Sequence, residues 1–246
     1  MSSYRDFAAV YDRLMHEDID YNAWADYLEA IFKRYEKTPR LICDLACGTG
    51  NVTLPLAQRG YEMIGVDRSF DMLAIAREKA ADKKQDILFL QQDMTKLDLY
   101  GTVDVMLCMI DGLNYILLPS QLLALFKRVK TCFLEQDGLF VFDISTRHKL
   151  SHTLGSNTFI YNEPDVFYTW QNRYRAPLCD MLLTFFVRQE GGWYKRFEER
   201  HLQHAYSNAQ ICALLFEAGF EKVDLFDALS FETPKKGSER VFFVAR

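Results

Sequence analysis

The chain has 246 residues, 49% of them hydrophobic and 26% charged, and its formal net charge is −5 at pH 7. This length suits one α/β domain with an elaboration, and the composition is that of a globular protein with a sizeable core. The acidic balance argues against a large nucleic-acid footprint, although a small RNA contact stays open. No apolar run approaches the ~20 residues of a membrane span and the N-terminus is unlike a signal peptide, so we expect a cytoplasmic protein without membrane contacts.

The cysteine and histidine spacings do not predict a metal site. Only Cys43 and Cys47 are close in sequence, and no second close pair completes a zinc site. His148 and His152 would share a helix face but lack a third ligand. We therefore predict that the six cysteines are reduced, buried packing residues.

Residues 4 to 37 are predicted to form a helical lead-in. Asp20 can cap a helix whose apolar side chains recur at positions 21, 24, 28, 31 and 35, the spacing of one helix face. Aromatic residues at such spacing usually pack in a core, so Tyr11 and Trp24 have a packing interpretation beside any binding role.

The most informative stretch is a strand followed by two glycines. The apolar run 41–46 leads into Gly48 and Gly50, and a helix-compatible run follows. Nucleotide-binding α/β folds open in this way, because glycine lets the backbone approach a ligand closely. A second strand over 61–66 ends before Asp67, 17 residues after Gly50. That is close to the ~20-residue spacing at which an acid meets ribose hydroxyls.

Two features separate this stretch from the dinucleotide-binding pattern. The third glycine position is occupied by Thr53. In addition, Asp44, Asp67 and Asp93 each lie at or near the C-terminal end of an expected strand, so they should gather at one edge of the sheet. Three carboxylates there would repel a pyrophosphate and attract a ligand with an ammonium and a sulfonium. The pattern favours a cationic nucleoside.

Strands and helices alternate up to Ser145. The expected strands are 41–46, 61–66, 87–91, 103–110 and 139–144. Ser69 can cap a helix to about Lys84, and Pro119 opens a helix to about Phe133 that the segment 136–138 closes. Such alternation indicates a parallel sheet.

The segment after the fourth strand should carry the reacting centre, because ligands of open α/β sheets lie outside the carboxyl ends of the strands. Its polar candidates are Asp111, Asn114 and Tyr115. Asp111 and Asn114 are equally compatible with local turn or cap hydrogen bonds.

The pattern changes to consecutive strands between residues 158 and 206. Three β-rich runs, 166–174, 181–188 and 193–206, are separated by turns, which predicts an antiparallel insert. Of the arginines in this insert, Arg173 and Arg196 are our candidates for a pocket. The alternative is that they solvate an exposed sheet face or pair with glutamates such as Glu198.

The C-terminal part completes the sheet. Ser207 and Gln210 form a capping box that begins a helix, and Gly219 ends it. The runs 220–229 and 240–245 should pair as an antiparallel hairpin. We predict an α/β fold: a Rossmann-like, doubly wound, seven-stranded sheet with an antiparallel last strand, a helical N-terminal lid and an antiparallel β insert.

These motifs resemble those of the class I S-adenosylmethionine-dependent methyltransferases. The run 44–50 looks like their first motif, 65–67 like the second and 92–94 like the third. The likeness covers nearly the whole chain, including Val10-Tyr11-Asp12 and the run 21–24, which are of a kind seen in bacterial small-molecule methyltransferases of this class. The resemblance implies S-adenosylmethionine as cofactor, S-adenosylhomocysteine as product and a small-molecule acceptor.

The resemblance also implies roles for individual residues. The lead-in 1–37 would fold over the cofactor with Tyr11 near the sulfonium, where an aromatic face favours a cation. Asp93 would accept the adenine amino hydrogens, and the insert 158–206 would roof the substrate pocket. The implied cofactor-binding residues are Tyr11, Trp24, Asp44, Ala46, Gly48, Gly50, Asp67, Arg68, Met72, Asp93, Met94 and Cys108. The candidate pocket residues are Asn114, Tyr115, Arg173 and Arg196.

Methyl transfer from a sulfonium requires mainly alignment and exclusion of water, which supply ~7–11 kcal/mol. A base is needed only for a protonated acceptor, and the candidates are Asp111, Tyr11 and His201. The alternatives are an RNA-directed methyltransferase, a non-catalytic S-adenosylmethionine-binding protein and, less favoured, an NAD-dependent oxidoreductase. Thr53, Asp44 and the lack of a Tyr-x-x-x-Lys pair argue against the last of these.

Overall fold

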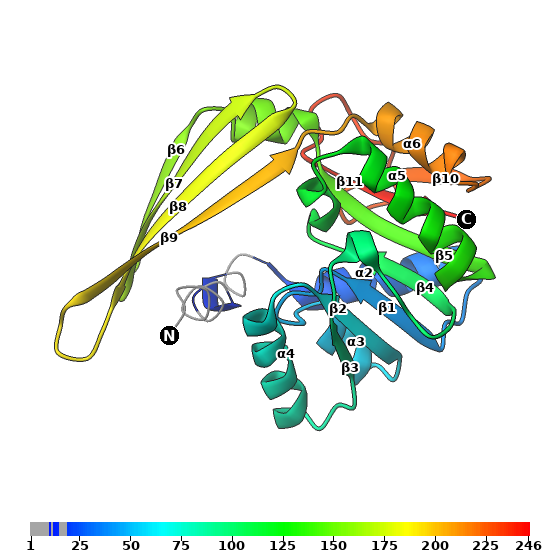
Figure 1. Cartoon of the computed structure of the whole chain (residues 1–246), viewed down its shortest axis with the longest axis horizontal. Helices are drawn as coiled ribbons and strands as arrows, with labels where there is room; N and C mark the ends of the chain where they lie inside the picture. Colours follow the sequence, from blue (N-terminus) through cyan, green and yellow to red (C-terminus); the bar gives the residue numbers. More distant parts are fainter. Residues whose placement is uncertain (1–9, 11, 15–18) are drawn as a thin grey trace.

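The structure is a computed structural model that describes residue 10, residues 12–14 and residues 19–246. Figure 1 shows a mixed sheet flanked by helices and a second, long antiparallel sheet that projects from one end of it. None of the helices in the described ranges is both long and apolar enough to span a bilayer.

The main sheet has seven strands in the order β10-β11-β5-β4-β1-β2-β3. Strands β1 to β5 pair in parallel, and β11 pairs antiparallel with both β5 and β10. The strand bounds are Leu41–Leu45 (β1), Glu62–Asp67 (β2), Leu88–Gln91 (β3), Val103–Cys108 (β4), Leu134–Ser145 (β5), Val223–Asp227 (β10) and Arg240–Ala245 (β11). The predicted seven-stranded sheet with an antiparallel last strand is confirmed.

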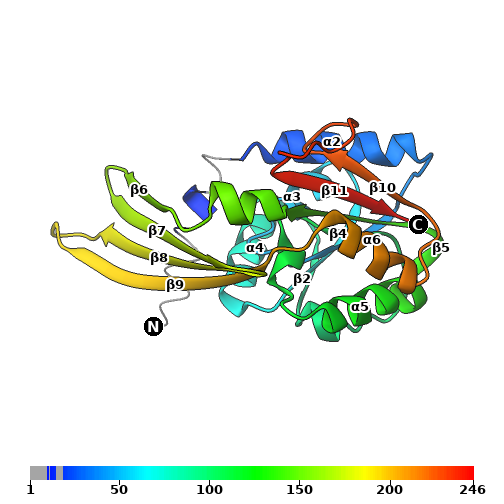
Figure 2. The same ribbon diagram turned by 90° about the horizontal axis from the view of Figure 1, so that it is seen from above.

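Helices cover both faces of this sheet (Figure 2). On one face, Trp24 and Tyr27 of α2 place their rings 5.2 and 4.9 Å from the ring of Phe242 in β11. On the other face, Phe126 of α5 lies 5.7 Å from Phe140 and from Phe142 of β5. The helix bounds are Tyr21–Arg34 (α2), Thr53–Gln58 (α3), Phe70–Asp82 (α4), Pro119–Arg128 (α5) and Asn208–Glu217 (α6).

Short helical segments connect several of these elements. The bounds are Met94–Lys96 (η1), Gly112–Tyr115 (η2), Val129–Phe133 (η3) and Lys149–Thr153 (η4). The expected caps are present: Asp20 accepts from the N–H of Asn22 and Ala23, Ser69 accepts from the N–H of Met72, and Ser207 forms a full capping box. Each cap satisfies donors that a helix N-terminus leaves unpaired.

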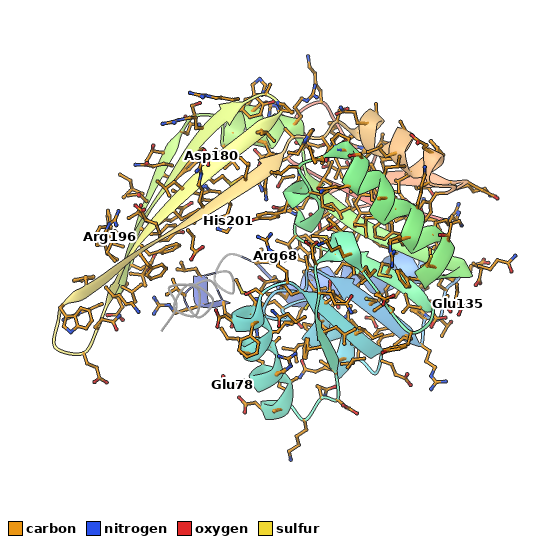
Figure 3. All side chains as sticks on the ribbon, viewed as in Figure 1. Arg68, Glu78, Glu135, Asp180, Arg196 and His201 are labelled. Atoms are coloured by element: carbon orange, nitrogen blue, oxygen red, sulfur yellow. The ribbon has the colours of Figure 1, made fainter. Side chains whose placement is uncertain are left out.

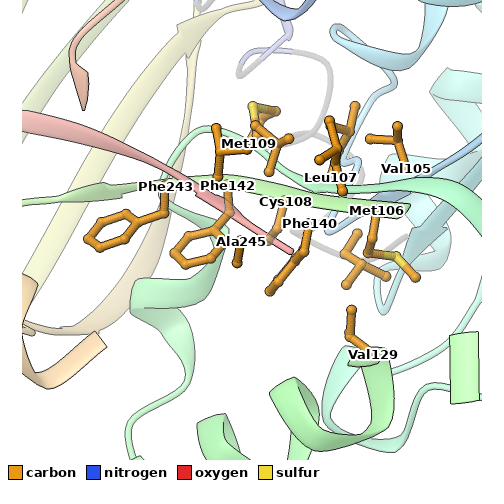
Figure 4. Close-up of a cluster of buried hydrophobic side chains, with 14 of the residues drawn as sticks. Val105, Met106, Leu107, Cys108, Met109, Val129, Phe140, Phe142, Phe243 and Ala245 are labelled. Atoms are coloured by element: carbon orange, nitrogen blue, oxygen red, sulfur yellow. The ribbon is translucent and has the colours of Figure 1, made fainter. Parts of the chain in front are cut away.

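The core runs along the central strands (Figure 4). The β4 residues 105–108 are all fully buried, since helices cover both faces of the parallel part of the sheet. Phe142 of β5 stacks on Phe243 of β11 with ring centroids 5.0 Å apart. These contacts fix the position of the strand ends, where the candidate site lies.

Two expectations about local structure were wrong. Strand β5 begins at Leu134, so the segment 136–138 belongs to the strand and does not end a helix. The register between β4 and β5 shifts between Val103 and Val105. Gly138 lies in this irregular part of β5, where a Cβ would come within 2.7 Å of the Leu134 side chain. The six cysteines are free, but Cys132 is exposed, so it is not a buried packing residue.

The predicted antiparallel insert is confirmed as a four-stranded sheet, ordered β6-β7-β8-β9. Its bounds are Thr158–Asn162 (β6), Val166–Arg175 (β7), Leu178–Arg188 (β8) and Tyr194–His204 (β9). We call the side that carries Tyr168, Phe185 and Phe197 the inner face, because these rings pack with Met72 of α4 and with Val10. Side chains alternate between the inner face and an exposed outer face.

Candidate functional site

The acidic residues of the predicted notch lie at one edge of the main sheet. Parallel pairing brings Asp44 of β1 opposite Gly65 of β2, and Asp67 ends β2. Asp93 follows β3 and begins η1, and Asp111 follows β4 and begins η2. The carboxyl ends of the parallel strands therefore form one acidic edge, which we call the strand edge.

Asp44 is the most deeply buried of these acids. Its side chain is 2% exposed, and Oδ2 accepts a 2.6 Å hydrogen bond from the hydroxyl of Thr53. Burial raises the pKa of Asp44 to about 7; the Thr53 hydrogen bond opposes the shift and the neighbouring Asp67 adds to it. Thr53, which occupies the third glycine position of the sequence motif, therefore has a function that we did not predict: it holds this carboxyl.

Asp67 connects the glycine turn to β2. Its Oδ2 accepts from the backbone N–H of Gly48 at 2.9 Å, and its Oδ1 accepts from the N–H of Ser69 at 2.8 Å. Burial raises the pKa of Asp67, although these hydrogen bonds and the adjacent Arg68 act in the opposite direction. Gly48 has a φ of +56°, and a Cβ added there would meet nothing within 4 Å. The Asp67 carboxylate thus holds the glycine turn, while the space where a Cβ of Gly48 would lie is open.

The segments that follow β1 and β4 come into close contact. Ala46 has a φ of +54°, which is uncommon for a residue with a Cβ. A Cβ added to Gly112 would lie 2.8 Å from the sulfur of Cys108 and 3.2 Å from the Cβ of Ala46. Cys108 is fully buried, and burial raises the pKa of its thiol well above the usual value. Ala46 and Cys108 thus both lie against Gly112 at this edge, and their role in cofactor binding stays a prediction.

Asp93 is largely exposed and is held by one neighbour. Its Oδ1 accepts from both the backbone N–H and the hydroxyl of Thr95, at 2.9 and 2.8 Å. Burial alone would raise the pKa of Asp93, but these two hydrogen bonds, together with the nearby Arg68, bring it below its ordinary value. Met94 follows in η1 and packs against the main core.

The geometry does not support Asp111 as a base. Its Oδ1 binds Arg240 at 2.8 Å and its Oδ2 accepts from Gln203 of β9 at 2.7 Å. Burial would raise the pKa of Asp111, but the Arg240 cation outweighs burial and lowers it. Arg240 also binds the fully buried Asp143, which accepts the backbone N–H of Asp111 at 3.0 Å. Asp111 is therefore a bound structural anion at the strand edge, and the prediction that it is available for proton transfer is corrected.

The structure also corrects the prediction for Asn114. This side chain is fully buried, donates to the backbone oxygens of Ser145 and His204 and accepts from the N–H of Ser145, each at 3.0 Å. These partners are backbone groups at the last residue of β5 and the last residue of β9. Asn114 thus connects η2 to the insert and does not line a pocket.

Tyr115 and His201 are brought together, although they are 86 residues apart in sequence. The Tyr115 hydroxyl lies 3.2 Å from His201 Nδ1, and the two rings meet edge to face at 5.9 Å. His201 is on the inner face of β9. Burial and the nearby Arg68 lower its pKa, and Asp111 opposes them, so the imidazole is neutral near pH 7. Arg68 thus lies between the strand edge and the insert (Figure 3).

The two predicted pocket arginines lie on the outer face of the insert. Arg196 is five residues from His201 on the same strand, so their side chains alternate to opposite faces. Arg196 pairs with the side chain of Glu198, which lies on the same face of the strand. Arg173 pairs in register with Asp180, whose carboxylate binds Arg200 of the outer face at 2.7 Å. The pocket assignment of Arg173 and Arg196 is therefore corrected.

Part of the predicted lid can be placed. Tyr11 lies outside the described residues. Asp12 accepts from the hydroxyl of Thr49 in the glycine turn at 2.6 Å and pairs with Lys79 of α4 at 2.8 Å. We had not assigned Asp12 a role, although the resemblance included the run 10–12. Trp24 is 6% exposed and packs beneath Arg240, whose Cζ lies 5.4 Å from the ring.

The chemistry of these residues fits S-adenosylmethionine. A glycine turn that is open at Gly48 admits a flat nucleoside, and the acids around it suit a cation. Within the described ranges, no group of three or more histidine, cysteine, aspartate or glutamate side chains could hold a metal ion.

Comparison with known proteins agrees with this geometry. Residues 42–137 match a family model described as a methyltransferase domain. The protein named "Putative methyltransferase GWCH70_2453" of Geobacillus sp. (strain WCH70) is 37% identical over 99% of both chains. "Putative methyltransferase YqeM" of Bacillus subtilis (strain 168) is 32% identical over 99% of this chain and 96% of its own.

Solved structures give the same result. An S-adenosylmethionine-dependent methyltransferase from Clostridium acetobutylicum ATCC 824 superposes with a TM-score of 0.91 at 33% identity, covering 100% of this chain and 99% of that one. The amino pentose methyltransferase CalS10 from Micromonospora echinaspora superposes with a TM-score of 0.75 over 96% of both chains, at 16% identity, and shares the fold. The glycine turn, the acidic strand edge and these full-length likenesses together show that the chain belongs to the class I S-adenosylmethionine-dependent methyltransferases.

Proposed function

We propose that this methyltransferase acts on a small molecule held between the strand edge and the inner face of the insert. The observation that carries the proposal is the contact between Tyr115 of η2 and His201 of β9, which places an inner-face side chain over the strand edge. A site enclosed by a sheet on one side and strand ends on the other suits a small acceptor more than a nucleic-acid helix.

The cofactor would be held by the acids and the glycine turn. Asp67 binds two backbone N–H groups, and each of its oxygens keeps a second lone pair for a ribose hydroxyl. Both hydrogen bonds from Thr95 fall on Oδ1 of Asp93, which leaves Oδ2 for an amino group of adenine. When bound, S-adenosylmethionine supplies a methyl group from its positively charged sulfur, and the sulfur keeps the electron pair of the bond that breaks.

The protein would contribute alignment, exclusion of water and proton transfer. Holding the acceptor in line with the methyl group supplies the largest part, on the order of 7–11 kcal/mol. His201 is neutral near pH 7 because burial lowers its pKa, so it can accept a proton from an acceptor that arrives protonated. The Tyr115 hydroxyl would hold the imidazole in position. Asp111 and Arg240 would keep η2 in place without exchanging protons.

The likeness to CalS10 and other sugar-directed enzymes is below 25% identity and concerns the fold. The likeness to a 23S rRNA methyltransferase of Shewanella sediminis covers only 27% of this chain. The small-molecule proposal therefore rests on the enclosed geometry, and RNA is tested beside it.

Two measurements test the proposal. Calorimetric titration with S-adenosylmethionine, S-adenosylhomocysteine and NAD should give binding of the first two and none of the third. Transfer of labelled methyl groups is then screened against amines, hydroxyl compounds, carboxylates and short RNAs. Methylation of a small molecule supports the proposal. Methylation of RNA alone, or binding without any transfer, would replace it with one of the two alternatives.

A further inference from the structure

The inner face of the insert carries three polar groups without a partner. Glu199 of β9 is 7% exposed, and its carboxylate makes no hydrogen bond or ion pair within the described residues. The indole N–H of Trp170 and the side-chain oxygen of Asn172, both on β7, are fully buried and make no hydrogen bond to the part of the chain that the structure describes. Such groups are rare in folded proteins, because each costs the free energy of its lost hydration.

Strand register places these groups in one patch. Trp170 pairs with Leu183, and Leu183 pairs with Glu199, so Trp170 and Glu199 lie in the same cross-strand row. Asn172 shares the next row with Met181 and His201. Neighbouring strands are about 4.8 Å apart, so the patch spans roughly 10 Å. One end of it lies beside His201, whose ring contacts Tyr115 of η2.

The side chains of Asn172 and Trp170 are held in place by their neighbours. The amide nitrogen of Asn172 donates to the backbone oxygen of Asn157 at 3.2 Å, which fixes the orientation of its unpaired oxygen. The ring of Trp170 packs 5.9 Å from Phe159. By contrast, Glu198, the neighbour of Glu199 on the outer face, is paired with Arg196. The unpaired buried atoms that the insert shows among the described residues therefore lie on the side that faces the proposed acceptor site.

We propose that Glu199, Asn172 and Trp170 form the recognition subsite for the acceptor, and that the acceptor carries a basic amine next to a hydrogen-bonding oxygen. The carboxylate of Glu199 would accept hydrogen bonds from the ammonium, and the Asn172 oxygen would accept a further N–H or O–H. The indole N–H of Trp170 would donate to the oxygen of the acceptor. This inference rests on the proposed function, since it names the acceptor class of the same site.

The charges around the patch favour an amine over an acid. Burial raises the pKa of Glu199, so a bound ammonium gains from pairing with its carboxylate. Lys195 lies on the same face four residues away and has interactions of its own. Arg68, on the opposite wall, lies near His201. An acceptor whose only charge is a carboxylate would meet Glu199 unpaired and be repelled.

The test uses matched probes on the full-length protein saturated with S-adenosylhomocysteine. Benzylamine, tyramine and glucosamine are compared by calorimetry with the uncharged benzyl alcohol, tyrosol and glucose, and with the acidic benzoate, 4-hydroxyphenylacetate and gluconate. We expect at least one amine to bind ten times more tightly than its uncharged and acidic counterparts. Glu199→Gln should abolish that preference, and Trp170→Phe, which keeps the ring, should weaken binding threefold or more.

Glu198→Gln is the matched control, and it should leave the preference unchanged because its side chain is on the outer face. The proposal is overturned if no amine binds better than its counterparts, if the acids bind best, or if Glu199→Gln keeps the preference. In each of these cases retained binding of S-adenosylhomocysteine leaves the proposed function standing. Loss of that binding in the unmodified protein would instead refute the proposed function.

Discussion

The strand edge and the inner face of the insert differ in how completely their polar groups are paired. At the strand edge, Asp111 and Asp143 are bound by Arg240, and both oxygens of Asp67 accept backbone N–H groups. On the inner face, Glu199 and two buried polar atoms have no partner among the described residues, whereas the glycine turn has one such atom, the amide nitrogen of Asn51. The first region is preorganised, whereas the second keeps unused capacity for a ligand. Preorganised groups suit a cofactor common to the family, and unpaired groups suit the variable acceptor.

The largest expected effect comes from breaking the paired network. Arg240→Ala leaves Asp111 and Asp143 as uncompensated buried charges, so we expect the free energy of unfolding to fall by about 3–5 kcal/mol. Urea denaturation measures this loss. Arg40→Ala, which removes an exposed partner of Glu62, is the control and should cost far less. Equal losses in the two variants would show that the network does not stabilise the strand edge.

His201 tests the point where the two regions meet. His201→Gln should lower the turnover of any identified acceptor about 10²–10³-fold and leave the affinity for S-adenosylhomocysteine unchanged. Because burial lowers the pKa of His201, activity of the unmodified protein should fall only below the ordinary histidine range, near pH 6.5, and this acid limb should vanish in the variant. A variant that keeps the same pH–rate profile would assign the proton transfer to another group.

Asp67→Ala removes the acceptor of the Gly48 and Ser69 N–H groups and the proposed ribose contact. We expect the affinity for S-adenosylhomocysteine, measured by calorimetry, to fall about 10–100-fold, the range for hydrogen bonds to a charged group. Circular dichroism should show an intact fold. Affinity equal to that of the unmodified protein would contradict the assignment of this acid to the cofactor site.

We expect Asp44 to make cofactor binding depend on pH. With its pKa raised to about 7, Asp44 is largely protonated at pH 6, and a bound cation favours the ionised form. Affinity for S-adenosylmethionine should therefore rise, at most about tenfold, between pH 6 and pH 8, and binding should release protons. The folded protein without cofactor holds this proton more tightly than the unfolded chain, so this group's contribution to stability is lost as pH rises from about 4 to 7. Proton uptake on binding would contradict this linkage.

The smallest effect is expected on the outer face of the insert. Arg196→Ala removes an exposed ion pair with Glu198, so turnover and cofactor affinity should both stay within about twofold of the unmodified protein. A large loss of turnover would indicate that Arg196 contributes to the acceptor site and that the two faces of the insert are wrongly assigned.

The sequence predicts the fold and the position of the strand edge because both depend on local signals. The strand ahead of Gly48, the acid that ends β2 and the cap at Ser69 can each be recognised within a few residues. Asp111 was misjudged because Arg240, which sets its charge state, is 129 residues further along the chain. Asn114 was misjudged for the same reason, since its partners Ser145 and His204 are 31 and 90 residues further along the chain.

The sequence alone could have placed Arg196 on the correct face of its strand. Once a strand is expected over 193–206, the two-residue period puts Arg196 and His201 on opposite faces. Arg173 required the register between β7 and β8, which only the structure gives. The same alternation places Glu199 on the face of His201, but its lack of a partner depends on the packing of the whole insert.

Hydrogen–deuterium exchange with and without S-adenosylhomocysteine tests the division between the two regions most directly. We predict that the cofactor protects residues 44–50, 65–69 and 93–95 and leaves β7 to β9 unchanged around Trp170, Asn172 and Glu199. Protection of those insert strands by the cofactor alone, without protection of the strand edge, would contradict the account.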